Sequence, residues 1–171
     1  GTNPDAEPIS RPTLANFTII GRPDGDPGAD GILLRRGTGG LLYNFIITDF
    51  LDACIDVDGE ATEARMGVIT NPNDGDLEIY NSINWCPDGV EFEDDGDVDG
   101  ATIEAWYFAD PNNRVTAPNL TSNGSPNSAD GAGTGFVSVD YIGAFEQDSA
   151  DNNWTEGWSV SLNGNTTAWE P

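Results

Sequence analysis

The stretch LYNFII at residues 42–47 has two counterparts in the chain, LANFTI at 14–19 and IYNSIN at 79–84, each with asparagine in third place. A second short apolar run follows each of them: GILL at 31–34, CIDV at 54–57 and GVEF at 89–92. Strands that alternate with turns of variable length suit a parallel β-helix, because each coil stacks on the one before and its turns absorb extra residues. The repeat predicts an all-β protein, a short parallel β-helix of about three coils. Three Greek-key hairpins that share the pattern are the alternative.

The three repeated asparagines occupy the same place in each predicted coil. Stacking would therefore align Asn16, Asn44 and Asn81, and their side-chain amides could pass hydrogen bonds from coil to coil. We expect such an asparagine ladder if the β-helix interpretation is right.

The composition excludes several classes of function. The chain of 171 residues has 30 Asp and Glu against 6 basic residues, all Arg, and a net charge of −24. So negative a surface repels nucleic acids and anionic lipids, and no apolar run is long enough to span a membrane. We expect no nucleic-acid partner and no membrane insertion. The same charge favours divalent cations, and 37% hydrophobic residues suffice for a core.

Changes in composition divide the chain into four segments. Residues 1–12 form an N-terminal extended segment, and 13–109 contain the β-helix coils, with one helix-like stretch at 59–65. Residues 110–135 consist almost entirely of turn-forming residues and indicate an extended linker or loop. Residues 136–171 contain three of the five tryptophans. We expect this aromatic segment to pack back on the β-helix as a latch.

Two cysteines stand next to corresponding strands of neighbouring predicted coils, Cys54 in the second and Cys86 in the third. Strands in adjacent coils lie about 4.8 Å apart, so a disulfide between them is sterically reasonable. Such a bridge would stabilise the fold by about 3–4 kcal/mol in the chain-entropy model. Two buried free thiols are the alternative.

The acidic loop DDGDVDG at 94–100 begins like a calcium-binding loop, with aspartates at alternate positions before a glycine. The bidentate Glu of an EF-hand is absent, because Trp106 takes its place, and both flanks look strand-like. Calcium could still bind with a borrowed carboxylate, and the predicted ligands are Asp95, Asp97, Asp99 and Glu104. A solvated acidic turn is the alternative, and the acidic turns at 24–31, 56–60 and 71–78 compete as calcium sites.

The runs at 31–62, 52–58 and 81–95, and the closing DYIGAF…NWTEGW at 140–158, resemble a known family. They are similar to the C-terminal region of secreted bacterial right-handed parallel β-helix proteins of the pectate-lyase-like superfamily. The resemblance covers about residues 13–160 and implies a right-handed β-helix. Hydrolases of that superfamily use N-x-D, D-D, G-H-G and R-x-K motifs. This chain has no Lys and no His, which removes the last two, so we expect no catalytic residues and no enzyme.

The resemblance also implies more coils than this chain has, because family members place many coils before these. A coil with nothing stacked on it exposes unpaired backbone groups that can pair with another chain. We therefore expect an extracellular or cell-surface structural protein that assembles head-to-tail with copies of itself into a fibre or matrix, stabilised by calcium. The alternative is a module that binds carbohydrate or processes polysaccharide, with glycans as partners.

Overall fold

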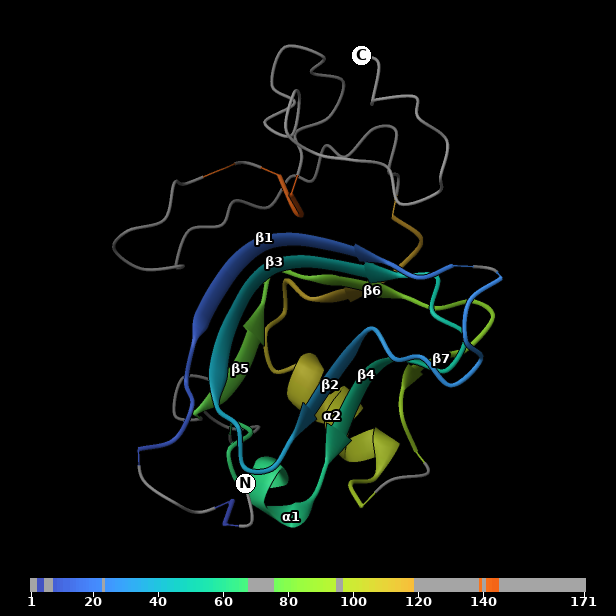
Figure 1. Cartoon of the computed structure of the whole chain (residues 1–171). Coiled ribbons are helices and arrows are strands. Elements are labelled where there is room, and N and C mark those ends of the chain that lie inside the picture. The colour runs from blue at the N-terminus through green and yellow to red at the C-terminus, as the bar shows by residue number, and fades with distance from the viewer. Residues whose placement is uncertain are drawn as a thin grey trace, which may run out of the picture.

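A computed structural model of the chain describes residues 3–4, 8–22, 24–67, 76–94, 97–118, 139 and 141–144. Two parallel sheets face each other across one core (Figure 1). One sheet has the order β1-β3-β6-β8 with β5 also paired to β3, and the other has the order β2-β4-β7. The strands are β1 (Thr13–Ile20), β2 (Ile32–Arg35), β3 (Gly40–Thr48), β4 (Ala53–Asp58), β5 (Leu77–Tyr80), β6 (Ile83–Trp85), β7 (Val90–Phe92) and β8 (Arg114–Val115). The chain thus passes from one sheet to the other and back, as a parallel β-helix does.

The register in the larger sheet matches the sequence repeat. Leu14 pairs with Leu42, and Phe17 pairs with Phe45. In the next pair of strands Leu42 lies beside Ile79 and Ile46 beside Ile83. The alignment of LANFTI, LYNFII and IYNSIN is therefore confirmed residue by residue.

In the smaller sheet, the predicted register is correct for the pair β2 and β4 but not for the pair β4 and β7. Ile32 pairs with Ile55 as expected. In the third coil, however, Ile55 pairs with Phe92, whereas the sequence alignment set it against Val90. The error is two residues, and because side chains alternate with a period of two it leaves the same face of the strand inside. The apolar pattern alone therefore could not distinguish the two registers.

The repeated asparagines bend the chain. Asn16, Asn44 and Asn81 have φ values of 63°, 67° and 49°. This left-handed conformation is costly for most residues, and asparagine tolerates it better than other non-glycine residues. Asn16 and Asn44 turn the long strands β1 and β3 in mid-course, and Asn81 separates β5 from β6. The asparagine of the repeat is thus explained by backbone geometry.

Two helices interrupt the strands, α1 (Glu60–Glu63) and α2 (Gly100–Tyr107). The first lies in the stretch predicted to be helix-like. The second corrects the expectation that the acidic loop has strand-like flanks, since α2 begins at the end of that loop. Asp99 caps it by accepting a hydrogen bond of 2.8 Å from the backbone nitrogen of Ala101. None of the helices in the described residues is long and apolar enough to cross a membrane.

The core lies between the sheets and extends under α2. Ile103, Trp106 and Tyr107 of α2 are buried in the same cluster as inward side chains of the strands, among them Leu42, Phe45, Ile47, Ile55, Val57, Leu77 and Ile79. The indole nitrogen of Trp106 donates to the carbonyl oxygen of Leu77 at 2.9 Å. We call this side of the molecule the helix-covered end, because α2 lies across the core behind β2 and β4 (Figure 1).

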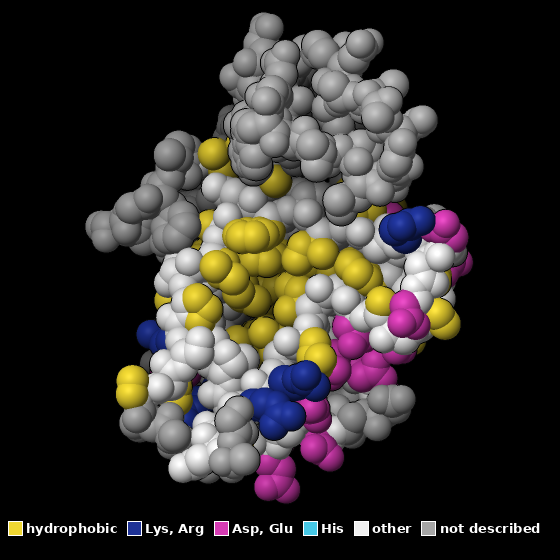
Figure 2. Space-filling view, viewed as in Figure 1, with side chains coloured by type: hydrophobic (Ala, Val, Ile, Leu, Met, Phe, Trp, Pro, Cys, Tyr) yellow, Lys and Arg dark blue, Asp and Glu magenta, His cyan; other side chains and the backbone are white. Residues whose placement is uncertain are grey.

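At the opposite end, no described helix covers the core in this way. Among the described residues β1 pairs only with β3, and β2 pairs only with β4. Four large apolar side chains of these outer strands are exposed: Leu14 at 37%, Phe17 at 43%, Ile20 at 52% and Leu33 at 41%. We call these four residues the open end. Figure 2 shows a broad apolar area on this face, with basic and acidic groups beside it.

Candidate functional site

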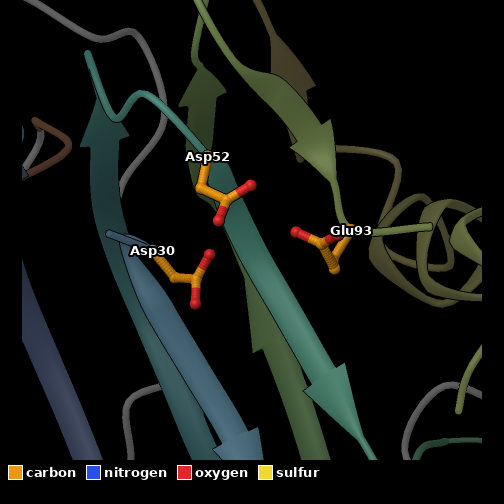
Figure 3. Close-up of side chains that lie close together, drawn as sticks. All are labelled: Asp30, Asp52 and Glu93. Carbon is orange, nitrogen blue, oxygen red and sulfur yellow. The ribbon is translucent and has the colours of Figure 1, made fainter. Parts of the chain in front are cut away.

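Three carboxylates from different parts of the chain converge beside the smaller sheet. Asp30 stands just before β2, Asp52 just before β4, and Glu93 just after β7. One oxygen of each lies within 4.8 Å of the others. Figure 3 shows the side chains of these residues pointing toward one another. We call them the carboxylate cluster.

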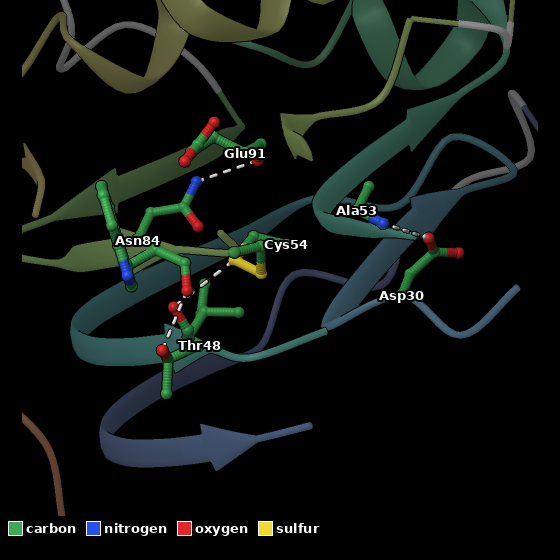
Figure 4. Close-up of a disulfide and its surroundings, with 9 residues drawn as sticks. Asp30, Thr48, Ala53, Cys54, Asn84 and Glu91 are labelled. Carbon is green, nitrogen blue, oxygen red and sulfur yellow. Dashed lines mark hydrogen bonds between the residues drawn. A yellow bond between two sulfur atoms is a disulfide. The ribbon is translucent and has the colours of Figure 1, made fainter. Parts of the chain in front are cut away.

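The strand pairing holds this cluster in place. The backbone nitrogen of Val90 donates to the carbonyl oxygen of Asp52 at 2.7 Å, and that of Glu93 donates to Ile55 at 3.0 Å. Asp30 Oδ1 accepts a hydrogen bond of 3.3 Å from the backbone nitrogen of Ala53 (Figure 4). Because these bonds join successive coils, the cluster forms only when the coils stack.

Three converging carboxylates have the chemistry of a site for a hard divalent cation. Calcium takes six to eight oxygen ligands, so the cluster would supply part of its shell, with carbonyl oxygens or water supplying the rest. The sequence had suggested the acidic turn at 24–31, which contains Asp30, as one competing site. It gave no reason to combine Asp30 with Asp52 and Glu93, because that combination depends on the stacking of three coils.

The calcium ligands predicted in the acidic loop lie in different surroundings from those of the carboxylate cluster. Asp95 lies outside the described residues. Asp99 caps α2, while Asp97 and Glu104 are exposed at the surface. In the described part of the loop no three acidic side chains converge as those of the carboxylate cluster do. Calcium binding at this loop stays a prediction.

A groove with a volume of about 450 Å³ runs between β7 and α2. Its acidic lining comes from Glu91, Asp94, Asp99 and Glu104, so it contains two of the predicted calcium ligands. Its apolar lining includes Val90, Phe92, Phe108 and Val115. Phe108 is 43% exposed, so its ring is available to a ligand. The carboxylates can accept hydrogen bonds from the hydroxyl groups of a sugar, and the aromatic ring can stack against it.

The asparagine ladder exists in part. Asn44 Nδ2 donates to Asn16 Oδ1 at 2.6 Å, and also to the carbonyl oxygen of Tyr141 at 2.7 Å. Asn44 Oδ1 is buried and has no partner among the described residues. In the third coil, the backbone nitrogen of Asn81 donates instead to Asp110 Oδ2 at 2.9 Å. This bond joins the first two asparagines of the predicted ladder, and no described bond extends it to the third.

Residues 110–115, which the sequence assigned to a linker, continue the β-helix. Asp110 and Asn113 are buried, and Asn113 Oδ1 accepts a hydrogen bond of 2.8 Å from the backbone nitrogen of Ser82. The next two residues form β8, which pairs with β6. Asp110 and Asn113 therefore lie against the bend at Asn81 in the third coil. The rest of the predicted linker from residue 119 lies outside the described residues.

The described part of the aromatic C-terminal segment contacts the larger sheet. Ile142 is fully buried against Ile46 and Ile83. The backbone nitrogen of Gly143 donates to the carbonyl oxygen of Asn44 at 3.0 Å, and that of Ala144 donates to Thr18 Oγ1 at 3.0 Å. Residues 145–171, with the three tryptophans of this segment, lie outside the described residues.

The predicted disulfide is present between Cys54 and Cys86, whose Cα atoms are 5.8 Å apart (Figure 4). It joins β4 to the residue after β6, across a sequence separation of 32. Both cysteines are buried in the core cluster. The bridge therefore ties the second coil to the third, as expected.

Comparison with known proteins gives one match. The protein-family model described as "Pectate-lyase like beta helix domain" matches residues 1–159. No curated protein and no solved structure matches the chain.

Proposed function

Because this chain belongs to the pectate-lyase-like β-helix domain family, we propose that it is a non-enzymatic, extracellular structural module that associates with other copies of itself. In this proposal about three coils form the module, and segment 136–171 latches their flank. The observation that carries the proposal is the open end, where apolar side chains of β1 and β2 lie exposed beside strand edges that no other described strand pairs with. Exposed apolar surface of this kind marks an interaction site.

The residues of the chain support a role without catalysis. Pectate-lyase-like folds occur in enzymes and in non-enzymes, so the family alone does not decide. The whole sequence has no Lys and no His. Of the six arginines, Arg11 and Arg65 contact Asp76, and Arg22 contacts Asp24. These contacts favour a role for these arginines in stabilising the acidic surface over a role as catalytic general bases.

The disulfide supports an extracellular or cell-surface location. Disulfides persist in oxidising compartments and are rare in the cytosol of mesophiles. The bridge between Cys54 and Cys86 is buried in the core, so it is structural. The proposal includes stabilisation by calcium, for which the carboxylate cluster offers ligands that join three coils.

The two ends of the module differ, which bears on how copies would assemble. Head-to-tail stacking into a fibre needs an open coil at each end. At the helix-covered end Trp106 and Tyr107 occupy the core instead. The geometry therefore favours association through open ends, and a fibre would require α2 to move.

A second candidate function rests on the groove between β7 and α2. Its exposed Phe108 and its four carboxylates suit a carbohydrate, so a glycan-binding role is the alternative. The groove is acidic throughout, which favours neutral or cationic sugars over polyuronates. A polysaccharide-processing role would need a catalytic pair among these same carboxylates.

One experiment distinguishes the two functions. Light scattering after size-exclusion chromatography would measure the mass of the wild-type chain, of Leu33→Asp at the open end, and of Val90→Asp at the other end. Self-association predicts an oligomer that Leu33→Asp dissociates and Val90→Asp leaves intact. A wild-type monomer that binds neutral or amino-sugar oligosaccharides, with affinity lost in Phe108→Ala, would overturn the structural function in favour of the alternative.

A further inference from the structure

Copies of this chain can meet in two ways, and the ends of the module select between them. In the described part, the open end exposes four large apolar side chains of its outer strands, whereas the other end exposes two, Val90 at 45% and Phe108 at 43%. At the other end the edge strands β7 and β8 have three and two residues, and α2 covers the core beside them. Contact between two open ends therefore covers the larger number of exposed apolar side chains in both copies.

Two identical ends that face each other are related by a two-fold axis in their interface. Across such an axis, two copies of one edge strand pair antiparallel, because an antiparallel pair exchanges its hydrogen bonds reciprocally. The strand β2 is short and lies at the edge of its sheet. It would therefore continue the smaller sheet from one copy into the other.

The backbone of β2 limits the registers of this pairing. The backbone nitrogen of Gly31 donates to the carbonyl oxygen of Ala53 in β4. Since successive residues of a strand direct their N–H and C=O groups to opposite sides, Ile32 and Leu34 direct theirs to the open side. The two-fold register in which both of these residues bond reciprocally pairs Ile32 with Leu34 of the second copy, and it places Leu33 opposite its own counterpart on the axis.

The charges flanking β2 fit an antiparallel arrangement. Arg35 and Arg36 are exposed at one end of β2, and Asp24 and Asp26 are exposed near the other. Basic and acidic groups lie on this face in Figure 2. The two-fold axis brings the basic end of each strand over the acidic end of the other, so the face is complementary to itself.

We propose that the open end is the interface of a closed two-fold dimer, in which β2 pairs antiparallel with β2 of a second copy and Leu33 meets Leu33. This inference rests on the proposed function, since it names the partner and the geometry of the self-association. A closed interface of this kind stops at two copies, whereas a head-to-tail contact continues into a filament.

A cysteine on the axis tests the geometry. In a non-hydrogen-bonded antiparallel pair the Cα atoms lie about 4.5 Å apart, within the range of a disulfide. Leu33→Cys should form a covalent dimer on mild oxidation, in EDTA, on a non-reducing gel. Val90→Cys, equally exposed at the far end, is the matched control and should stay monomeric. The native cysteines are already bonded to each other and buried, so they do not interfere.

The outcomes separate this inference from the function on which it rests. A chain that associates, but whose Leu33→Cys variant cross-links no better than Val90→Cys, would overturn the two-fold dimer and leave self-association standing. Cross-links between Leu33→Cys and Val90→Cys in a mixture would show head-to-tail contact and would also overturn it. A wild-type chain that stays monomeric at every concentration would overturn both.

Discussion

The side-chain amide of Asn44 donates a hydrogen bond of 2.6 Å to Oδ1 of Asn16 in the preceding coil, and both residues hold left-handed backbone conformations. One residue type thus serves two purposes, since asparagine tolerates the bend and its side chain links the coils. Asn44 also binds the carbonyl oxygen of Tyr141, which connects the bend to the C-terminal segment.

The first prediction concerns this buried asparagine. Asn44→Ala should lower the free energy of unfolding by about 2–4 kcal/mol, because it removes two partly buried hydrogen bonds and places alanine at φ 67°. Asn44→Gly should cost less, since glycine accepts that conformation. Urea denaturation measures both values. If glycine and alanine destabilise equally, the backbone explanation of the repeat is wrong.

The second prediction concerns the disulfide. Replacing both Cys54 and Cys86 with alanine should lower the free energy of unfolding by about 3–4 kcal/mol, because the unfolded chain regains the freedom of a closed loop. Denaturation of the wild type with and without a reductant should give a similar difference. Equal midpoints in the two conditions would contradict a structural role for the bridge.

The third prediction concerns the cover that α2 forms. Trp106→Ala should destabilise the protein by about 3–5 kcal/mol, since it leaves a cavity in the core and removes the hydrogen bond to Leu77. Phe108→Ala, two positions along, is the control, and because Phe108 is already 43% exposed its cost should stay below that. Comparable losses in the two variants would mean that α2 does not seal this end.

The fourth prediction concerns alkaline pH. Burial raises the pKa of Tyr107 above its ordinary value of 10.0, and the charge of Asp110 raises it further. The folded state therefore keeps this proton while the unfolded state loses it, so stability is intact below about pH 10 and declines above it. In Tyr107→Phe the slope of stability against pH should be shallower in that range. An unchanged slope would show that other groups govern alkaline unfolding.

The fifth prediction concerns calcium. If the carboxylate cluster provides the proposed stabilisation, millimolar calcium should raise the midpoint of thermal unfolding, and Asp52→Asn should reduce that rise. Asp97→Asn is the matched control in the acidic loop. A rise that survives Asp52→Asn but disappears in Asp97→Asn would favour the loop predicted from sequence over the cluster.

Local sequence predicted the stacking but not the features that depend on several coils at once. The repeat around Asn16, Asn44 and Asn81 gave the register of the larger sheet, because one residue per coil must adopt an unusual conformation. The carboxylate cluster could not be predicted from the sequence because its members occupy different positions relative to their strands. They converge only after the turns between coils have set the geometry.

The helix α2 was not predicted from the sequence, for a different reason. Its eight residues are too few to show helical periodicity, and the aspartates and glycines before it look like a turn. The sequence predicts Asp99 as a calcium ligand, and the structure shows in addition that its side chain caps the helix. Missing α2 also concealed the difference between the two ends, so the sequence favoured a head-to-tail fibre.

Sedimentation equilibrium of the unmodified chain over a wide concentration range tests the central claim most directly. Self-association through open ends predicts a single reversible equilibrium between monomer and dimer, with no larger species at the highest concentrations. A monomer mass throughout, or a mass that keeps rising past two copies, would contradict it.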